Sequence, residues 1–350
     1  MPTIKPEVLV SAISKIFRAL RVPPDAARVV AEHLVDADLC GVASHGIIRV
    51  PQYVEAVEAG RVEADARLVI ERETMSAVRL DGGNGFGQVM ARGAMEIAVE
   101  RAGRTGAAVV TLHNCGHTGR IGAYTEQAAR RGMAALMMVN SGGCGQWVAP
   151  FGGAAGRLAT NPLSLAVPTE SGDPLLLDIA TSVAPEGKIR TKLGAGQPIP
   201  LNWAVDHRGE PTTNPADLYG PPRGALLPFG GHKGFGLSML VDALAGGLSG
   251  AGCCTDADRP LAGQTDGVLI VAINVSAFCR PAEFLNMIQR QIAHVKSAPP
   301  SAGTAEILVP GELEGRTRRQ RLRDGIPLED STWKQLQQSA SRFHVALPAD

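Results

Sequence analysis

The 350-residue sequence has no long apolar run and no excess of charge of either sign. Its apolar stretches fall short of the roughly 18 consecutive apolar residues that predict a membrane-spanning helix. Residues 1–17 also lack the basic-then-apolar pattern of a secretory signal. Lysine and arginine number 34, as do aspartate and glutamate, so no global field attracts nucleic acid or an anionic membrane. We therefore expect a cytoplasmic protein that binds neither nucleic acid nor membrane.

Cysteine is scarce, at six residues, and no two cysteines form a CxxC pair. Cys253 and Cys254 are adjacent, which suits neither a zinc site nor a simple disulfide framework. We expect reduced thiols, as in the cytosol, and no bound metal. Aromatic residues make up only 4% of the chain, and none interleaves with the densest basic run, residues 316–323. This run is therefore interpreted as a solvated face or a clamp on a cofactor phosphate, not as a nucleic-acid site.

Glycine is abundant, at 41 residues, and 45% of the residues are hydrophobic. This mixture is typical of an α/β protein with many tight turns. Helical periodicity predicts helices over most of residues 5–60 and near both 281–296 and 330–343, the last capped by Asp330 or Ser331.

Near-continuous apolar strands are expected between helices in the middle of the chain, for example at 107–114, 133–141 and 267–274. Such strands indicate a sheet covered on both faces. We expect one long helix at 233–250 and long loops over 194–224.

The glycine fingerprint of a Rossmann fold, G-x-G-x-x-G between a strand and a helix, is absent. The nearest string, residues 82–87, has the wrong spacing and no suitably placed acidic residue after it, so a structural turn is the better interpretation. If a dinucleotide binds this protein, the sequence predicts that it binds to a non-Rossmann fold.

Ser44, His45 and Gly46 stand where a loop enters a predicted helix that begins near Ser44 and ends before Gly60. If that helix starts near His45, then His45 and Arg49 lie one turn apart on one face. Arginine grips a carboxylate with two hydrogen bonds, and histidine can give a proton to a carbonyl oxygen as hydride arrives. The same residues could instead form a helix cap and a surface His–Arg pair.

His117 follows the predicted strand 107–114 in a glycine-rich turn that leads into a helix. Turns in this position present binding groups in open α/β sheets. Asp178 ends another strand, where its carboxylate could bind ribose hydroxyls or cap the next turn through Thr181 and Ser182.

Lys233 stands at the start of a predicted helix, where a cation opposes the helix dipole. A phosphate between Lys233 and the helix amides would account for this placement. The alternative is a solvated lysine between turn glycines.

Short strings in order along nearly the whole chain resemble the malate/L-lactate dehydrogenase family of type 2, which is unrelated in fold to the ordinary lactate and malate dehydrogenases. The strings are Ser44-His45-Gly46 with Arg49, His113-Asn114-Cys115-Gly116-His117-Thr118-Gly119, Val139-Asn140-Ser141, Ala149-Pro150-Phe151-Gly152-Gly153, Thr160-Asn161-Pro162, Asp178-Ile179-Ala180-Thr181-Ser182, Glu186-Gly187-Lys188, Gly230-Gly231-His232-Lys233-Gly234-Phe235-Gly236 and Pro310-Gly311-Glu312. Each string alone is weak, and the ordered set is specific.

This resemblance implies a homodimer that binds NAD or NADP on a mixed, non-Rossmann sheet flanked by helices, with the N- and C-terminal helical segments packed together. It implies His45 as the first-ranked proton donor, Ser44 and His117 as further catalytic residues, and a substrate site at Arg49, Thr160 and Lys188. It also implies cofactor contacts from His117, Thr118, Gly119, Asn140, Ser141, Asp178, Ile179, Ala180, His232, Lys233, Pro310, Gly311 and Glu312. Where the family usually has His-Phe-Gly, this chain has His117-Thr118-Gly119.

The expected reaction moves hydride between the nicotinamide and a small 2-oxo or 2-hydroxy acid of malate, lactate or ureidoglycolate type. The alternative is reduction of a cyclic imino acid such as Δ1-pyrroline- or Δ1-piperideine-2-carboxylate. In the imino-acid reductase branch of the family that this chain resembles, the position of Lys188 is an aspartate that completes a Ser-His-Asp relay. Lysine here therefore favours the 2-oxo acid. Two further alternatives are a pyridoxal-phosphate enzyme with a Schiff base on Lys233 and a binding protein without catalysis.

The predicted organisation has three parts. Residues 1–65 form a helical segment that carries the Ser-His-Gly string, residues 66–275 form the central sheet domain, and residues 276–350 form a C-terminal helical segment.

Overall fold

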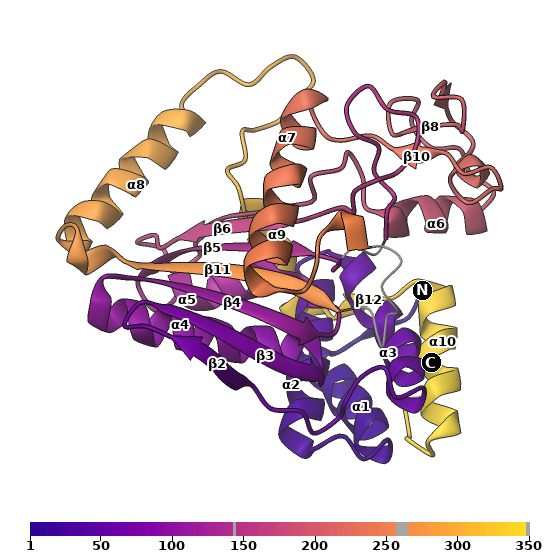
Figure 1. Cartoon of the computed structure of the whole chain (residues 1–350), viewed down its shortest axis with the longest axis horizontal. Helices are drawn as coiled ribbons and strands as arrows, with labels where there is room; N and C mark the ends of the chain where they lie inside the picture. The colour runs from indigo at the N-terminus through magenta and orange to yellow at the C-terminus, as the bar shows by residue number, and fades with distance from the viewer. Residues whose placement is uncertain (143–144, 257–264, 348–350) are drawn as a thin grey trace.

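The structure is a computed structural model that describes residues 1–142, 145–256 and 265–347. Its centre is a seven-stranded sheet in the order β2-β3-β4-β11-β5-β6-β7 (Figure 1). The strands are β2 (Val69–Glu73), β3 (Ala77–Gly85), β4 (Ala107–Cys115), β5 (Met133–Asn140), β6 (Leu163–Val167), β7 (Leu175–Ile179) and β11 (Asp266–Asn274). β3 and β4 pair in parallel and the other five neighbouring pairs are antiparallel. The expected mixed, non-Rossmann sheet is confirmed.

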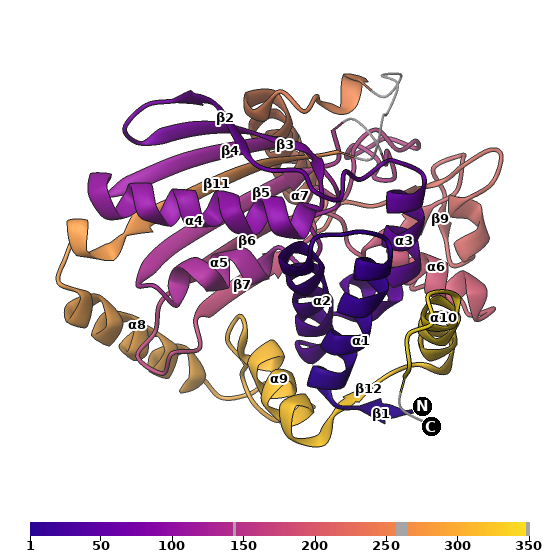
Figure 2. The ribbon, with the colours of Figure 1, turned by 90° about the horizontal axis from the view of Figure 1, so that it is seen from below.

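Helices cover the two faces of this sheet unequally. α4 (Gly87–Thr105) and α5 (Gly122–Ala129) cover one face (Figure 2), where the strands and α4 share one buried core. On the other face, α7 (His232–Val241) and the π-helix η4 (Asp242–Gly247) cover only part of β5 and β11. Val109, Leu165 and Ile273 on this face remain exposed. The expected helices on both faces are therefore confirmed, although they leave part of the second face open, and the helix expected at 233–250 is present with a π-helical segment, η4, within it.

The two ends of the chain build a helical unit beside the sheet (Figure 2). Its helices are α1 (Pro6–Ala19), α2 (Pro24–Leu39), α3 (Val50–Glu58) and α10 (Asp330–Arg342), and its two short strands are β1 (Thr3–Ile4) and β12 (Ile326–Pro327). Phe17, Leu34 and Trp333 share one core there, so the expected packing of the N- and C-terminal segments is confirmed. Neither Asp330 nor Ser331 caps α10, because the N-cap residue is Glu329, without a side-chain cap.

A third core lies within the range expected as one central domain. It surrounds Val148, Leu158 and Ile189, next to α6 (Glu186–Gly194) and a small sheet of β8 (Ala204–Val205), β9 (Pro211–Thr212) and β10 (Ala225–Leu226). The remaining elements are η1 (Ala43–His45), η2 (Ile47–Arg49), η3 (Pro215–Leu218), η5 (Cys254–Asp256), η6 (Val275–Ala277), α8 (Pro281–Lys296) and α9 (Glu312–Asp324). Within the described residues, no helix is both long and apolar enough to span a bilayer.

Candidate active site

A cleft of about 1670 Å³ lies where the helical unit meets the ends of β4, β5 and β7, with α6 on a further side. It brings together most of the residues singled out from the sequence. Those that line it are Ser44, His45, Arg49, His117, Gly119, Ser141, Thr160, Asp178, Ile179, Ala180, Lys188, Pro310 and Gly311. Five others are not among its lining residues: Thr118, Asn140, His232, Lys233 and Glu312.

The segment that carries His45 and Arg49 is not the single helix expected from the sequence. It forms two short 3₁₀ turns, η1 and η2, separated by Gly46, and α3 begins only at Val50. The buried carboxylate of Asp38 causes the break, because its Oδ2 accepts a hydrogen bond from the Ile47 amide at 2.7 Å. A Cβ on Gly46 would lie 2.1 Å from the same oxygen, so a side chain at this position is excluded.

His45 and Arg49 nevertheless face the same cleft. Ser44 Oγ lies 2.9 Å from His45 Nδ1, so Ser44 holds the ring and does not cap a helix. Arg49 donates from Nε to the Ser44 carbonyl at 2.7 Å and from Nη1 to Gln52 at 2.7 Å. A Cβ built on Gly187 would lie 3.7 Å from Arg49 Nη2, so the start of α6 faces this guanidinium. Since Nη2 has no hydrogen-bond partner in the described part of the chain, it is available to an anion.

His117 stacks on His45 with ring centroids 5.5 Å apart and planes 19° from parallel. Its Nδ1 lies 2.7 Å from the hydroxyl of Tyr53, and Gln88 donates to that hydroxyl at 2.8 Å. Tyr53 and Gln88 are buried and were not expected from the sequence. In the sequence, the helical periodicity around Tyr53 and Gln88 indicates only that they occupy core positions, not that they support a site.

Burial keeps both histidines of the pair neutral near pH 7. It lowers the pKa of His45 to about 4, and Arg49 and Arg120 add to the effect. Burial, His45 and Arg49 also hold the pKa of His117 well below its usual range. Two neutral imidazoles beside a guanidinium can accept or donate hydrogen bonds to a polar anionic ligand.

A buried ion-pair network supports the turn after His117. Arg120 pairs with Asp36 at 2.7 Å and with Glu126 at 3.1 Å, and Arg318 of α9 pairs with the same two carboxylates. In the basic run 316–323, Arg316 and Arg319 are likewise paired with acidic residues. Arg318 and Arg319 therefore join α9 to the protein body, which was not foreseen from the sequence.

Asp178 occupies the cleft wall at the end of β7. Its Oδ2 accepts a hydrogen bond from the Gly122 amide at 2.8 Å, at the start of α5. Asp178 therefore does not cap the turn at Thr181 and Ser182, which was the alternative expected from the sequence. Thr181 instead donates to the Thr160 carbonyl at 2.9 Å. Oδ1 of Asp178 has no partner among the described residues and can accept from a hydroxyl. Burial raises the pKa of this carboxyl.

Thr118 does not line the cleft but binds Asp266, which does. The amide and the hydroxyl of Thr118 both donate to Asp266 Oδ2, at 2.9 and 3.0 Å. Burial raises the pKa of Asp266 to about 7, and Asp266 is among the residues that line the cleft. Asp266 was not expected from the sequence. Its only signal was an acidic residue at the first position of an apolar strand.

Two other expected cofactor residues have structural partners, and a third is exposed. Asn140 donates to Asp242 at 3.0 Å and to the Gly252 carbonyl at 2.9 Å. Glu312 pairs with Lys296 at 2.6 Å, and its pKa falls to about 2 because Lys296 hydrogen-bonds the carboxylate. Lys233 is exposed at the start of α7. Its cofactor contact stays a prediction.

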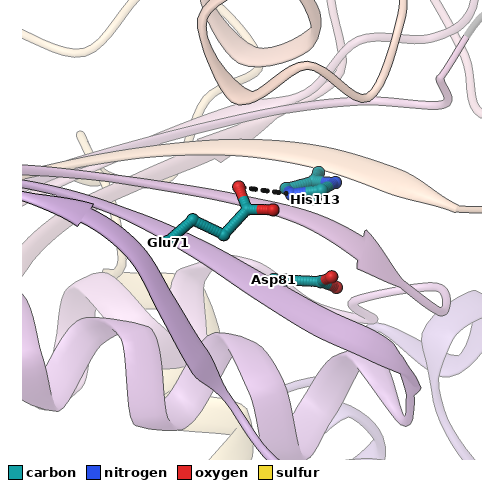
Figure 3. Close-up of side chains that lie close together, drawn as sticks. All are labelled: Glu71, Asp81 and His113. Atoms are coloured by element: carbon teal, nitrogen blue, oxygen red, sulfur yellow. Dashed lines mark hydrogen bonds and ion pairs between the residues drawn. The ribbon is translucent and has the colours of Figure 1, made fainter.

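A separate cluster of Glu71, Asp81 and His113 lies on the sheet (Figure 3). His113 Nε2 is 3.0 Å from Glu71 Oε2, and Arg79 Nε lies 2.8 Å from the same oxygen. Because Arg79 already supplies a positive charge to Glu71, the cluster forms an ion-paired network.

The cleft fits a dinucleotide beside a small acid. Its volume exceeds the roughly 300–1,000 Å³ of a site for a drug-sized ligand. Next to β7, its lining includes the small residues Ala180 and Gly311. Gly311 has φ of 85°, and a Cβ there would lie 3.2 Å from the Leu176 amide. Glycine therefore allows the backbone to line this wall closely.

Comparisons with known proteins agree over nearly the whole chain. A family model described as malate/L-lactate dehydrogenase matches residues 4–337. L-sulfolactate dehydrogenase of Methanothermobacter thermautotrophicus is 36% identical over 98% of each chain. The structure of malate dehydrogenase from Pyrococcus horikoshii superposes with a TM-score of 0.88 at 34% identity, covering 99% and 97% of the two chains.

The structure of Δ1-piperideine-2-carboxylate reductase from Pseudomonas syringae superposes with a TM-score of 0.83 at 31% identity, covering 97% of this chain and 100% of that one. The fold and family expected from the sequence are therefore confirmed, and the chain belongs to the malate/L-lactate dehydrogenase family of hydroxyacid oxidoreductases.

Proposed function

We propose that this protein transfers hydride between NAD or NADP and a small 2-oxo or 2-hydroxy acid of malate, lactate or ureidoglycolate type. The observation that carries the proposal is the meeting of His45, His117 and Arg49 in one cleft. Arg49 offers a free Nη2 to a carboxylate, and each histidine has its Nδ1 hydrogen-bonded to a side chain, which leaves Nε2 for the substrate. An acid with an adjacent carbonyl needs both kinds of group.

The cofactor would lie along the wall made by Gly119, Ser141, residues 178–180 and residues 310–311. Asp178 Oδ1 would accept from ribose hydroxyls, since its other oxygen is already bound to Gly122. When bound, the nicotinamide supplies or accepts the hydride. Calorimetry with Lys233→Ala tests the contact proposed for that residue, and unchanged affinity for both cofactors would remove it.

During reduction, the carbonyl carbon of the acid gains the hydride and the C=O π electron pair moves onto oxygen. That oxygen takes the proton of a His45 imidazolium, which leaves His45 neutral and the product a 2-hydroxy acid. In the oxidative direction, neutral His45 accepts the hydroxyl proton as the hydride leaves carbon. Arg49 would hold the carboxylate, and Thr160 and Lys188 line the same cleft.

The test is a panel of 2-oxo acids and cyclic imino acids, followed at the nicotinamide absorbance with each reduced cofactor. Oxidation of the cofactor with a malate-, lactate- or ureidoglycolate-type oxo acid supports the proposal. Turnover of only Δ1-piperideine- or Δ1-pyrroline-2-carboxylate would establish the imine alternative instead. Lys188 argues against that alternative, because an ammonium group cannot accept a proton from an imidazole as a carboxylate can.

We also propose a homodimer that works in the reducing cytosol. α8 has no buried residue, and Phe278, Met287 and Val295 in and beside it are exposed. Leu240 and Leu248 near η4 are exposed as well, and apolar surfaces of this kind favour association. Cys40, Cys115, Cys254 and Cys279 carry unbridged thiols, which fits a reducing compartment. A monomer in sedimentation at micromolar concentration would contradict the dimer.

A further inference from the structure

Gln88 is a buried side chain on the first turn of α4, with 1% of its surface exposed, and it does not line the cleft. Its Nε2 donates to the Tyr53 hydroxyl at 2.8 Å and to the His117 carbonyl at 3.1 Å. A carbonyl oxygen can only accept a hydrogen bond. The NH₂ end of the amide must therefore face His117, which fixes the orientation of Gln88. Its Oε1 is left buried without a partner among the described residues.

This orientation determines where the Tyr53 proton lies. The Tyr53 oxygen accepts from Gln88, so its single proton is free to be donated elsewhere. His117 Nδ1, at 2.7 Å, is the only acceptor that the described residues offer it. An Nδ1 that accepts a hydrogen bond carries no proton, so the proton of neutral His117 is on Nε2.

His45 is held in a different way. Its Nδ1 is bonded to Ser44 Oγ at 2.9 Å, and that hydroxyl has no second hydrogen bond within the described residues. The Ser44 hydroxyl can rotate to donate to an unprotonated Nδ1 or to accept from a protonated one. His45 can therefore gain and lose a proton without breaking a buried hydrogen bond, whereas His117 cannot.

We infer that Gln88 and Tyr53 are positioning residues that lock His117 as a neutral Nε2–H donor to the substrate oxygen, while His45 alone carries the transferred proton. The substrate role in this inference rests on the proposed function. The two stacked rings then have different roles. His117 stabilises the negative charge that develops on the substrate oxygen, and His45 supplies the proton.

The charged and titratable groups around His117 agree with a neutral ring. Arg49 from η2, His45 from η1 and His33 from α2 all lower the pKa of His117. Tyr53 faces it from α3, and burial raises the pKa of Tyr53. Asp266 of β11 binds the adjacent Thr118 and is itself partly protonated near neutral pH, since its pKa is about 7.

The test is the nitrogen spectrum of the full-length protein labelled with ¹⁵N-histidine, with the His117 signals assigned by their loss in His117→Asn. We expect Nε2 to bear the proton and Nδ1 to be unprotonated at pH 8. A protonated Nδ1 in the unsubstituted protein would overturn the inference. This measurement requires neither a substrate nor a foldable Gln88 variant.

Gln88→Glu is the sharpest variant, because it keeps the shape and replaces the donor with an acceptor. The carboxylate introduced by Gln88→Glu would accept a hydrogen bond from the Tyr53 hydroxyl. The Tyr53 oxygen would then accept a hydrogen bond from His117, so the proton of neutral His117 would move to Nδ1. Gln88→Met, the matched control, removes both polar atoms and should give a mixture of the two tautomers. An unchanged His117 tautomer in a folded Gln88→Glu protein would contradict the lock.

Kinetics separate this inference from the proposed function. With the best acid of the substrate panel, Gln88→Met should lower kcat by about tenfold with little change in KM, since the lost interaction belongs to the transition state. If no acid oxidises the cofactor, the proposed function fails. If turnover is normal in both Gln88 variants, the proposed function stands and the positioning role of Gln88 and Tyr53 is refuted.

Discussion

His113 and His117 lie close together in the chain, on β4 and in the turn that follows it, but their surroundings differ completely. His113 points from the sheet toward Glu71 (Figure 3), and Arg79 binds the same carboxylate. His117 lies beyond the end of the strand, against His45 and Tyr53, and lines the cleft. Partners, not residue type, decide the role of each histidine. The Glu71 carboxylate binds His113 Nε2 away from the cleft, whereas the Tyr53 hydroxyl binds His117 Nδ1 and the ring lines the cleft.

The largest expected effect comes from removing His45, the ring stacked on His117. His45→Ala should lower kcat by roughly 10²–10⁴-fold, the usual contribution of general acid–base catalysis, with a much smaller change in KM. His113→Ala is the matched control and should leave kcat nearly unchanged. Steady-state assays of both variants check this pair. Equal losses in the two variants would mean that the cleft is not the active site.

The second expected effect is a pH dependence that differs between the two directions of reaction. The pKa of His45 in the free enzyme is about 4. Reduction needs the protonated ring, so kcat/KM for the oxo acid should fall about tenfold per pH unit above pH 4. Oxidation needs the neutral ring, so kcat/KM for the hydroxy acid should rise through pH 4 and then level off. A reductive kcat/KM that is flat from pH 5 to pH 8 would exclude His45 as the proton donor.

Arg49 gives a third, smaller contrast. Arg49→Lys should raise KM for the acid by about tenfold or more and change kcat little, because a point charge cannot reproduce a planar two-bond grip on a carboxylate. Arg79→Lys, at the His113 cluster, serves as the control and should leave KM unchanged. If KM is unaltered in Arg49→Lys, the carboxylate is bound elsewhere in the cleft.

The sheet strands and most helices could be predicted from the sequence because their apolar periodicity is strong. The connections between these elements could not be predicted in the same way. The spacing of His45 and Arg49 predicts one regular helix. The hydrogen bond from the Ile47 amide to the carboxylate of Asp38, which belongs to α2, breaks that helix. The same limit applies to the covering of the sheet, because apolar strands do not reveal that one face lacks helices over Val109.

The family motifs led to His45, Arg49 and His117, but not to the residues that hold them. Gln88 and Asp266 act through hydrogen bonds between elements far apart in the chain. No local pattern encodes such contacts, so both residues looked like ordinary core or strand positions.

The smallest expected effect concerns Asp266, the acid beneath the His117 turn. Its folded-state pKa of about 7 lies above the reference value of 3.8. The folded state therefore retains a proton that the unfolded chain releases, and stability falls as pH rises from about 4 to about 7. Asp266→Asn keeps an oxygen for Thr118 and removes this titration. Its melting temperature should exceed that of the unsubstituted protein by a few degrees at pH 8, with much less difference at pH 4.

Asp206→Asn is the control of opposite sign, because hydrogen bonds from the Glu210 and Arg208 amides lower the pKa of Asp206. That substitution should reduce the melting temperature at pH 8. A loss of stability in Asp266→Asn that is greater at pH 8 than at pH 4 would show that the Asp266 carboxylate is charged in the folded protein, and its Thr118 contacts would then be charge-assisted.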